Sequence, residues 1–286
     1  MLDEINVKFY EEIKKFFSHL KSEISEETQY LFYKENYNIS ENSADGEPTT
    51  YFDDCIEKII VKNLHKINLG WEAFSEEIGY FSSEGRDKEL TFIIDPLDGT
   101  HNASIKFPFY TVSIAVYVSD ILTYAWVYDI ERDVEYIGIL DHGSYLVKNN
   151  KYVELKVNDT QNISKAVVGL IRPKNVKELY SQQNIIISTR KIRCLSCASL
   201  EIVYIAAGIY DAFIDLSENG YEKDCDIIAA YLILKEAGGD VYDNKGELIN
   251  FQEPSINFFT KRRNIIASCN STIKSMILEN LKGECI

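Results

Sequence analysis

Apolar residues recur at helical spacing in two segments near the start of the chain. Between residues 2 and 20 they occupy positions 2, 5, 9, 13, 16 and 17, and between residues 52 and 67 they occupy positions 56, 59, 60, 64 and 67. This spacing predicts two amphipathic helices, each with one buried face. The intervening residues 36–50 contain Gly46, Pro48 and many short polar side chains, which predicts an exposed and mobile loop.

The pattern changes to short apolar runs after residue 90. Residues 91–94 predict a strand that ends in a turn at residues 95–100. Further short runs, separated by turn residues, predict an antiparallel meander with strands at residues 111–118, 121–129, 134–140 and 144–148.

Strands and helices alternate in the rest of the chain. The pattern predicts strands at residues 167–171, 185–188, 212–215 and 264–268, and helices at residues 199–208, 226–237 and 272–281. Gly238 and Gly239 suit the end of the second of these helices. A meander sheet followed by alternating elements predicts an α/β (α+β) chain with an N-terminal part at residues 1–157 and a C-terminal part at residues 158–286.

Composition excludes some classes of partner. The 286 residues are 45% hydrophobic and 26% charged, which is typical of a globular protein and argues against wholesale disorder. The formal net charge of −15 argues against nucleic acid or an anionic membrane as a partner, because both are polyanions. A phosphorylated small molecule remains compatible with this charge if metal ions restore positive charge at the site.

The cysteines and the longest apolar run favour a cytoplasmic protein. The six cysteines are scattered, no signal peptide opens the sequence, and the longest apolar run, at residues 112–118, is interrupted by Ser113. Cys194 and Cys197 form a lone C-x-x-C without a second pair. Buried small hydrophobic residues are a better interpretation of this pair than a zinc or redox site.

The segment DPLDGT at residues 95–100 carries the strongest chemical signal. Pro96 favours an extended backbone at Asp95, so Asp95 and Asp98 sit at the mouth of a hydrophobic strand and can point to a common centre. Two carboxylates and the free Leu97 carbonyl are hard oxygen ligands, which suit Mg²⁺ or Mn²⁺. Gly99 allows backbone amides to approach an anion, and Thr100 can begin a short helix whose N–H groups bind phosphate.

Other acidic residues are ambiguous when each is considered alone. Glu76 and Glu77 are adjacent acids in a predicted loop, where the usual explanation is solvation. Asp226 opens a predicted helix and Asp53 lies near the start of another, and an aspartate at such a position is first of all an N-cap.

These elements occur together in the order of a known fingerprint. The chain has S-E-E at residues 75–77, D-P-L-D-G-T-H-N at 95–102, C-D-I-I-A-A at 225–230 and E-A-G-G at 236–239. Over roughly residues 45–240 it resembles the inositol monophosphatase superfamily, which implies a layered αβαβα sugar-phosphatase fold. Residues 44–49, 75–79 and 102–103 most resemble archaeal enzymes that hydrolyse both fructose 1,6-bisphosphate and inositol 1-phosphate.

The resemblance implies a role for each motif residue. Glu76, Asp95 and the Leu97 carbonyl would hold one Mg²⁺, and Asp95, Asp98 and Asp226 a second, with two or three ions in all, Mn²⁺ as a possible substitute and Glu77 in support. Asp53 and Thr100 would form a pair near the attacking water, and Gly99 and Thr100 would present N–H groups to the phosphate. Two metal ions activate water and stabilise an in-line displacement without a phospho-enzyme.

The match departs from the family pattern at two places. Cys225 replaces the usual tryptophan before the helix aspartate, at a position that packs rather than ligates. Residues 216–225 form a longer segment in which Lys223 is the only basic residue, where related bisphosphatases carry arginine for the second phosphate. That phosphate would need a cation from Lys223, Arg172, Lys174 or Arg193, so preference for a bisphosphate is left open. Ser199, Asp215 and Lys223 are candidates for polyol contact.

The sequence therefore predicts a Mg²⁺-dependent phosphomonoesterase for sugar or polyol phosphates. One alternative is a 3′-phosphoadenosine 5′-phosphate phosphatase, which would need a surface for adenine stacking. Another is a non-catalytic module that binds a phospho-ligand or a metal. The resemblance also implies a homodimer.

Overall fold

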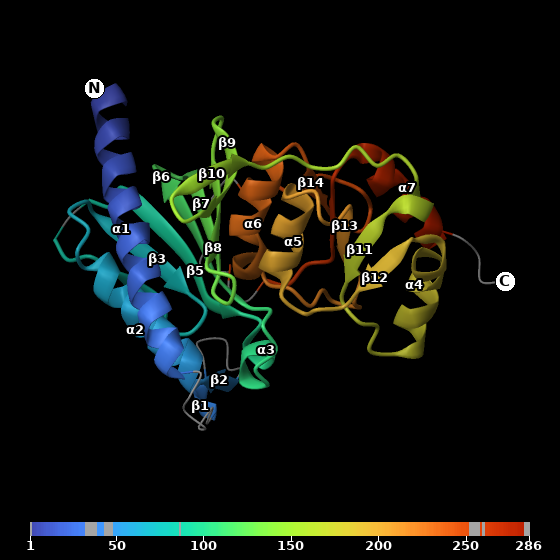
Figure 1. Cartoon of the computed structure of the whole chain (residues 1–286), viewed down its shortest axis with the longest axis horizontal. Coiled ribbons are helices and arrows are strands. Elements are labelled where there is room, and N and C mark those ends of the chain that lie inside the picture. Colours follow the sequence, from blue (N-terminus) through green and yellow to red (C-terminus); the bar gives the residue numbers. More distant parts are fainter. Residues whose placement is uncertain are drawn as a thin grey trace.

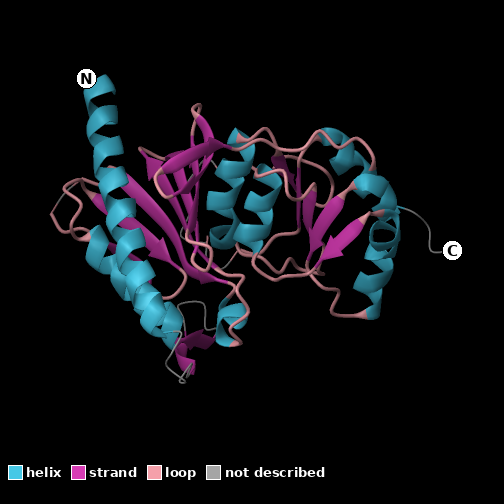
Figure 2. Ribbon diagram, viewed as in Figure 1, coloured by secondary structure: helices cyan, strands magenta, loops and turns pink. Residues whose placement is uncertain are grey.

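The computed structural model describes residues 2–31, 39–42, 48–85, 87–251, 258 and 261–282. Two β-sheets stand side by side with helices between and outside them (Figures 1 and 2). Helices α1 (Leu2–Leu31) and α2 (Tyr51–Leu64) cover the outer face of the first sheet, and a small antiparallel pair, β1 (Ile39–Asn42) and β2 (Pro48–Thr50), lies near them. Within the described residues, no helix has the length and apolar character needed to cross a membrane.

The first sheet contains the predicted meander. Its strand order is β10-β9-β8-β7-β6-β5-β3-β4, antiparallel throughout except that β3 runs parallel to β5. The strands are β3 (Trp71–Ser75), β4 (Gly79–Ser82), β5 (Leu90–Asp98), β6 (Thr111–Val118), β7 (Ile121–Asp129), β8 (Val134–Ile139), β9 (Gly143–Lys148) and β10 (Lys151–Glu154).

The second sheet is mixed. Its order is β12-β11-β13-β15-β14, in which the first three strands are parallel and β15 is antiparallel to both of its neighbours. The strands are β11 (Val167–Leu170), β12 (Lys191–Arg193), β13 (Ala212–Asp215), β14 (Asp240–Tyr242) and β15 (Ile265–Ser268). A short 3₁₀ turn, η1 (Ile163–Lys165), precedes β11.

Helices α5 (Ala198–Ala206) and α6 (Asp224–Glu236) lie between the two sheets, and α4 (Val176–Ser188) and α7 (Ser271–Lys282) lie on the outer side of the second sheet (Figure 1). Every residue of α5 is buried, as are residues 224–234 of α6. The sheet and α6 approach so closely that a Cβ on Gly138 of β8 would lie 2.9 Å from the backbone of Ile233. This order of layers confirms the predicted α/β sandwich of sheets and helices.

Two predictions for local structure were wrong, and a third ended a strand too early. The strand predicted at residues 91–94 is β5, which continues through Asp98 because it pairs with β6 again after a bulge. Residues 185–188 were predicted as a strand, because three successive isoleucines favour β structure, but they form the last turn of α4, where Ile187 is 81% exposed. Residues 36–50 were predicted as one loop, whereas residues 39–42 and 48–50 pair as strands and Thr49 and Thr50 are buried. The rest of that predicted loop, residues 36–38 and 43–47, lies outside the described residues.

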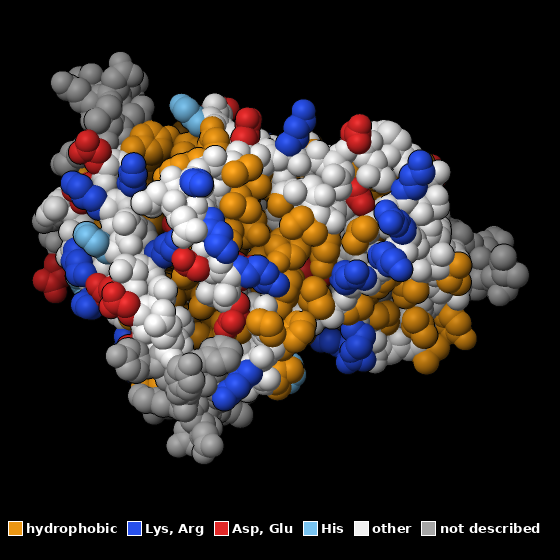
Figure 3. All heavy atoms as spheres, in the orientation of Figure 1, with side chains coloured by type: hydrophobic (Ala, Val, Ile, Leu, Met, Phe, Trp, Pro, Cys, Tyr) orange, Lys and Arg blue, Asp and Glu red, His pale blue; other side chains and the backbone are white. Residues whose placement is uncertain are grey.

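Charge on the surface is mixed rather than uniformly acidic on the face shown in Figure 3. Lys and Arg side chains are interspersed there with Asp and Glu, and hydrophobic side chains are exposed between them. The acidic excess of the chain is therefore not spread evenly, and part of it is buried in the site described next.

Candidate active site

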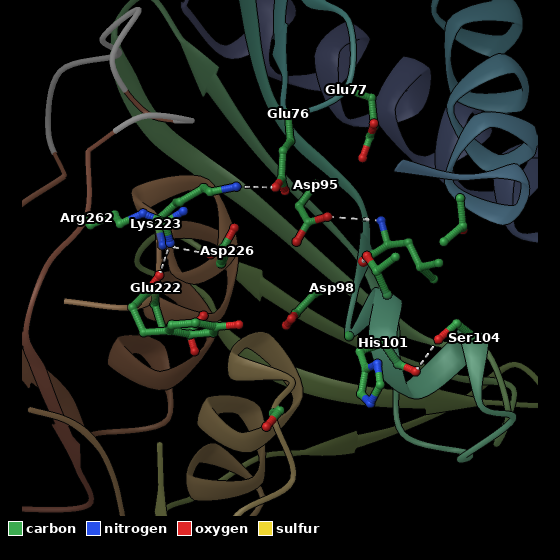
Figure 4. Close-up of a pocket in the computed structure, with 16 residues that line it drawn as sticks. Glu76, Glu77, Asp95, Asp98, His101, Ser104, Glu222, Lys223, Asp226 and Arg262 are labelled. Atoms are coloured by element: carbon green, nitrogen blue, oxygen red, sulfur yellow. Dashed lines mark hydrogen bonds and ion pairs between the residues drawn. The ribbon is translucent and has the colours of Figure 1, made fainter. Parts of the chain in front are cut away.

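A cavity of about 630 Å³ opens where the end of β5 meets the start of α6. Acidic side chains from separate elements point into it, as Figure 4 shows for Glu76, Asp95, Asp98 and Asp226. The full lining is Thr50, Glu76, Glu77, Asp95, Leu97, Asp98, Gly99, Thr100, His101, Ser104, Ser196, Tyr221, Glu222, Lys223, Asp226 and Arg262.

Asp95 and Asp98 lie on an irregular end of β5. The pairing of β5 with β6 shifts register between these two residues, and such a bulge re-aims side chains at the edge of a sheet. The Leu97 N–H donates to Asp95 Oδ1 at 3.0 Å. The N–H and the hydroxyl of Ser199 donate to Asp98 Oδ2 at 2.7 and 2.5 Å, so the start of α5 fixes the Asp98 carboxylate.

Asp226 enters the cavity from the first turn of α6. Its Oδ2 accepts the Lys223 N–H at 2.7 Å. The N-cap predicted at Asp226 is Lys223 instead, because α6 begins two residues earlier than predicted, and Asp226 is the third helical residue, which bonds back to the N-cap N–H. The same carboxylate lines the cavity, so the capping role and a ligand role do not exclude each other. Glu76, Cys225 and Asp226 offer ligand atoms that lie within 4.8 Å of one another.

Glu76 and Glu77 follow β3, in the turn before β4. The Glu76 N–H donates to the Ile94 carbonyl at 3.1 Å, which holds this turn against β5. Glu76 Oε1 lies 2.5 Å from Lys223 Nζ, so a basic side chain already partners one of the acids. Ser75, just before them, is fully buried and donates to Glu57 Oε2 at 2.5 Å.

The acids of the cavity raise one another's pKa. Burial raises the pKa of Asp95 well above its usual range, and the charges of Glu76, Asp226 and Asp98 add to the effect. Burial also raises the pKa of Asp98. Burial and the charge of Asp98 raise the pKa of Asp226 to about 6, although the positive charge of Lys223 acts to lower it. A concentration of carboxylate oxygens that repel one another in a buried site fits divalent cations with oxygen ligands.

A hydroxyl–carboxylate pair lies beside these acids. Thr100 Oγ1 is 3.0 Å from Asp53 Oδ1 and 2.9 Å from the Leu97 carbonyl oxygen, so its single proton has two alternative acceptors. Asp53 also accepts the Thr50 N–H at 2.9 Å within the capping box that begins α2. Burial raises the pKa of Asp53 despite these hydrogen bonds.

Gly99 makes the turn between β5 and α3 (Thr100–Ser104) possible. Its φ of +91° lies in the left-handed region, and a Cβ there would come within 2.9 Å of the Phe109 carbonyl oxygen. The short helix predicted at Thr100 is therefore present, directly after the carboxylates of β5.

Two predicted substrate contacts lie outside the cavity lining. Ser199 is fully buried, and its hydroxyl is engaged by Asp98 and by Thr111 Oγ1 at 2.6 Å. Asp215 is also fully buried and accepts the N–H groups of Ser217, Tyr221 and Glu222, which shapes the loop before α6. Neither side chain is placed to touch a polyol, and both instead position residues that line the cavity.

The sequence predicted only some of the basic residues that line the cavity. Lys223 lines the cavity as expected, whereas Arg172, Lys174 and Arg193 are not among the lining residues, and Arg262, which the sequence analysis did not single out, is. The cavity lining also includes residues that the sequence did not predict: Thr50, His101, Ser104, Ser196, Tyr221 and Glu222. Proximity in sequence to the motifs at 95–102 and 223–226 was an available signal for His101, Ser104 and Glu222.

Comparison with known proteins agrees with this geometry. The fold and the acidic cavity define a metal-dependent phosphatase, and the model of the inositol monophosphatase family matches residues 6–284. The chain therefore belongs to the inositol monophosphatase family.

Similar proteins span most of the chain. It is 28% identical to a fructose-1,6-bisphosphatase/inositol-1-monophosphatase of Thermococcus kodakarensis, over 92% of this chain and 94% of the relative. It is 30% identical to a fructose-1,6-bisphosphatase of Pyrococcus furiosus, over 84% and 86%. A solved structure of a hypothetical Pyrococcus horikoshii protein with similarities to inositol-1 monophosphatase superposes with a TM-score of 0.75 at 28% identity, covering 94% of this chain and 98% of that one.

Proposed function

We propose that this protein is a Mg²⁺-dependent phosphomonoesterase for sugar and polyol phosphates, with fructose 1,6-bisphosphate and inositol 1-phosphate as leading substrates. One observation carries the proposal: Glu76, Asp95, Asp98 and Asp226, from three separate elements, converge on one cavity beside the Thr100–Asp53 pair. The names of the relatives support the same substrates.

The donor set suits metal ions of this kind. Glu76, Asp95 and the Leu97 carbonyl would hold one Mg²⁺, while Asp95 would be shared with a second held by Asp98 and Asp226, and Glu77 would support the first set. Bound ions of this type supply positive charge for the phosphate and activate water. A third ion and replacement by Mn²⁺ are compatible with oxygen ligands.

The protein's own groups would orient the reaction. The Thr100 hydroxyl donates to Asp53 or to Leu97, so it can accept a hydrogen bond from water on its remaining lone pair and hold that water in line. When Thr100 donates to Asp53, the water would pass one proton to Thr100 Oγ1 while Thr100 passes its own proton to the Asp53 carboxylate. The N–H groups of Gly99 and Thr100 bind a phosphate oxygen, which stabilises charge on the phosphoryl group without a nucleophilic side chain.

The alternatives have less support. A 3′-phosphoadenosine 5′-phosphate phosphatase would need an open aromatic face, but Lys174 Nζ lies 3.7 Å from the ring centroid of Tyr221, the aromatic residue of the cavity wall. A non-catalytic binding module would not need the Thr100–Asp53 pair. The family resemblance further leads us to propose a homodimer, which sedimentation velocity would test.

A substrate panel tests the proposed function. Phosphate release from inositol 1-phosphate, fructose 1,6-bisphosphate and 3′-phosphoadenosine 5′-phosphate should be measured with Mg²⁺ and with EDTA. We expect Mg²⁺-dependent release from at least one of the first two, and little from the third. Release that persists in EDTA, or release from the nucleotide alone, would refute the proposal.

A further inference from the structure

Glu57 is a buried acid that the proposed mechanism does not use. It lies in α2, is 3% exposed and comes four residues after Asp53, so the two carboxyl groups share one face of the helix. Asp53 contacts the Thr100 hydroxyl at 3.0 Å, whereas Glu57 Oε2 accepts the Ser75 hydroxyl at 2.5 Å. Successive turns of α2 therefore contact two parts of the site: the proposed water-orienting pair and the turn that carries Glu76.

Ser75 connects α2 to this turn. It is fully buried at the end of β3, where it pairs with Ile94 of β5. The next residue, Glu76, donates its N–H to the Ile94 carbonyl at 3.1 Å, and Figure 4 shows its side chain beside Asp95. The sheet thus holds the backbone of the turn, and Glu57 holds the side chain of Ser75 from the opposite element, α2.

The surroundings of Glu57 favour a neutral carboxyl group. Among the described residues no Lys or Arg pairs with it, and its Oε1 has no hydrogen-bond partner. Burial raises the pKa of Glu57 to about 8, and the charges of Glu77, Asp54 and Glu76 add to the shift although the Ser75 hydroxyl opposes it. A neutral carboxyl group can accept the Ser75 hydroxyl and adds no charge to the acids of the cavity.

We propose that Glu57 is a positioning residue, which acts through Ser75 to place Glu76 for metal binding. Because Asp53 lies one turn earlier on α2, the same helix fixes the distance between Glu76 and the proposed water-orienting pair. Glu57 does not line the cavity, so it touches neither substrate nor metal itself. This inference rests on the proposed phosphatase function and adds to it a residue that the sequence motifs do not contain.

Removal of the Glu57 carboxyl group tests the inference. In Glu57→Ala, the Mg²⁺ concentration that gives half-maximal activity should rise by about 10-fold, the lower end of the effect of losing a group that orients a ligand. The kcat at saturating Mg²⁺ should change much less, because Asp53 and Thr100 are unaltered. A loss of folded protein alone would lower the amount of activity without moving this Mg²⁺ concentration. Glu57→Gln should need nearly the same Mg²⁺ concentration as the wild type, because its amide oxygen can accept the Ser75 hydroxyl.

Metal binding without substrate gives a second measurement. Mn²⁺ can replace Mg²⁺ at oxygen ligands, and the electron paramagnetic resonance signal of free Mn²⁺ reports how much of it is bound. The dissociation constant for Mn²⁺ should rise by about 10-fold in Glu57→Ala and in Ser75→Ala. The double variant should bind no more weakly than the weaker single variant, because both changes remove the same contact. Ser75→Ala deletes only a hydroxyl group, so it carries the test if Glu57→Ala does not fold.

Asn63→Ala is the matched control. Asn63 is also buried in α2, but its side chain donates to the Ile59 carbonyl at 2.9 Å and does not line the cavity. This variant should leave both metal constants unchanged, and an equal weakening in it would overturn the inference by showing a general effect of α2.

Two other results would overturn the inference while the phosphatase function stands. One is unchanged metal constants in Glu57→Ala and Ser75→Ala, and the other is a loss in Glu57→Gln as large as that in Glu57→Ala. A wild-type protein that binds Mn²⁺ but releases no phosphate from the substrate panel would overturn the proposed function instead, and the Mn²⁺ titrations would still decide the role of Glu57.

Discussion

Asp95 is the residue that the other acids of the cavity surround. It is 3% exposed, and the charges of Glu76, Asp226 and Asp98 all raise its pKa. We expect Asp95→Asn to lower kcat/KM by about a thousandfold or more, because metal binding contributes several kcal/mol to the transition state. In EDTA its melting temperature should equal or exceed that of the wild type, since one repelling buried charge is gone. The rise in melting temperature on addition of Mg²⁺ should be lost.

Phosphate release, circular dichroism and melting with and without Mg²⁺ would check this expectation. A variant that is folded and nearly as active as the wild type would contradict the assignment of Asp95 to the metals. A variant that is less stable in EDTA would instead show that the carboxylate is needed for folding.

Thr100 and Asp53 are expected to act as one unit. Their side chains are 3.0 Å apart, and positioning of the attacking water is worth about 10² to 10⁴ in rate. Thr100→Ala should therefore lower kcat by this range, with KM little changed and measurable activity left. Asp53→Asn should cause a similar loss, and the double variant should lose far less than the product of the two.

The same variants separate a water mechanism from a covalent one. If water is the nucleophile, reaction in ¹⁸O-water should label the released phosphate in a single turnover, and intact mass should show no phosphorylated protein. Fully multiplicative losses, or a trapped phospho-threonine at Thr100, would disprove the pairing.

At the scale of elements, the start of α5 holds the carboxylate of Asp98, a proposed metal ligand, in place. The Ser199 hydroxyl donates to Asp98 while Thr111 donates to Ser199, so one chain of hydrogen bonds joins α5, β5 and β6. Ser199→Ala should weaken apparent Mg²⁺ affinity by about 10- to 100-fold, the usual effect of removing a group that orients a ligand. The Mg²⁺ dependence of activity and of the melting temperature would measure it.

Ser144 provides the matched control for this prediction. It is fully buried in β9, and its hydroxyl has no hydrogen-bond partner among the residues that the structure describes. Ser144→Ala should leave Mg²⁺ affinity unchanged. If both serine variants weaken Mg²⁺ binding equally, the effect is general and the link from α5 to Asp98 is not responsible.

The sequence predicted strands well where the apolar run is long and turn residues bound it. The meander of β6 to β9 was confirmed nearly to the residue, because tight turns separate its apolar runs. The short strands β10, β12 and β14 contain only three or four residues each and were missed. Within α4, the isoleucine run at residues 185–187 favours β structure locally, but Asn175 caps a helix that continues through it.

The site was predictable where its residues are close in sequence. Asp95, Leu97, Asp98, Gly99 and Thr100 lie within six consecutive residues, from the end of β5 to the start of α3, and all line the cavity. Arg262 is brought there only by its bridge to Lys223, a pairing across the chain that no local pattern encodes. Conversely, a buried polar residue can be mistaken for a substrate contact, as Ser199 was, because its partner Asp98 lies 101 residues earlier in the chain.

At the scale of the whole molecule, the candidate active site lies between the first sheet and the segments that lead into α5 and α6. Asn102 of α3 donates to the Phe109 carbonyl at 2.8 Å and to the Leu195 carbonyl at 2.7 Å, so it ties the end of the first sheet to the segment that leads into α5. The proposed metal ligands likewise come from the first sheet and from α6, which lies between the sheets. The predicted division into parts at residues 1–157 and 158–286 stays a prediction. A catalytic cavity shared in this way would require the two parts to keep a fixed position relative to each other.

Buried acids should make the stability of the whole molecule depend on pH. Burial raises the pKa of Glu57 to about 8 and that of Glu201 to about 8, with nearby acids adding to both shifts. A folded-state pKa above the unfolded value stabilises the fold most below the unfolded pKa, near 4.5. That stability is lost as pH rises towards 8, by at most about 1.4 kcal/mol per pH unit for each group.

Glu201→Gln isolates one of these contributions outside the proposed metal ligands. Glutamine cannot ionise, so the free energy of unfolding should fall less steeply between pH 5.5 and 8, by up to ~1.4 kcal/mol per pH unit. Urea unfolding in EDTA and again in Mg²⁺ would measure the slope. The difference between wild type and variant should persist in Mg²⁺, because metal neutralises the cavity acids but leaves Glu201 in α5 to titrate. The absolute stability of the variant is a poor guide, since a buried amide adds donors that need partners. Parallel slopes for the two proteins would show that Glu201 does not change its charge over this range.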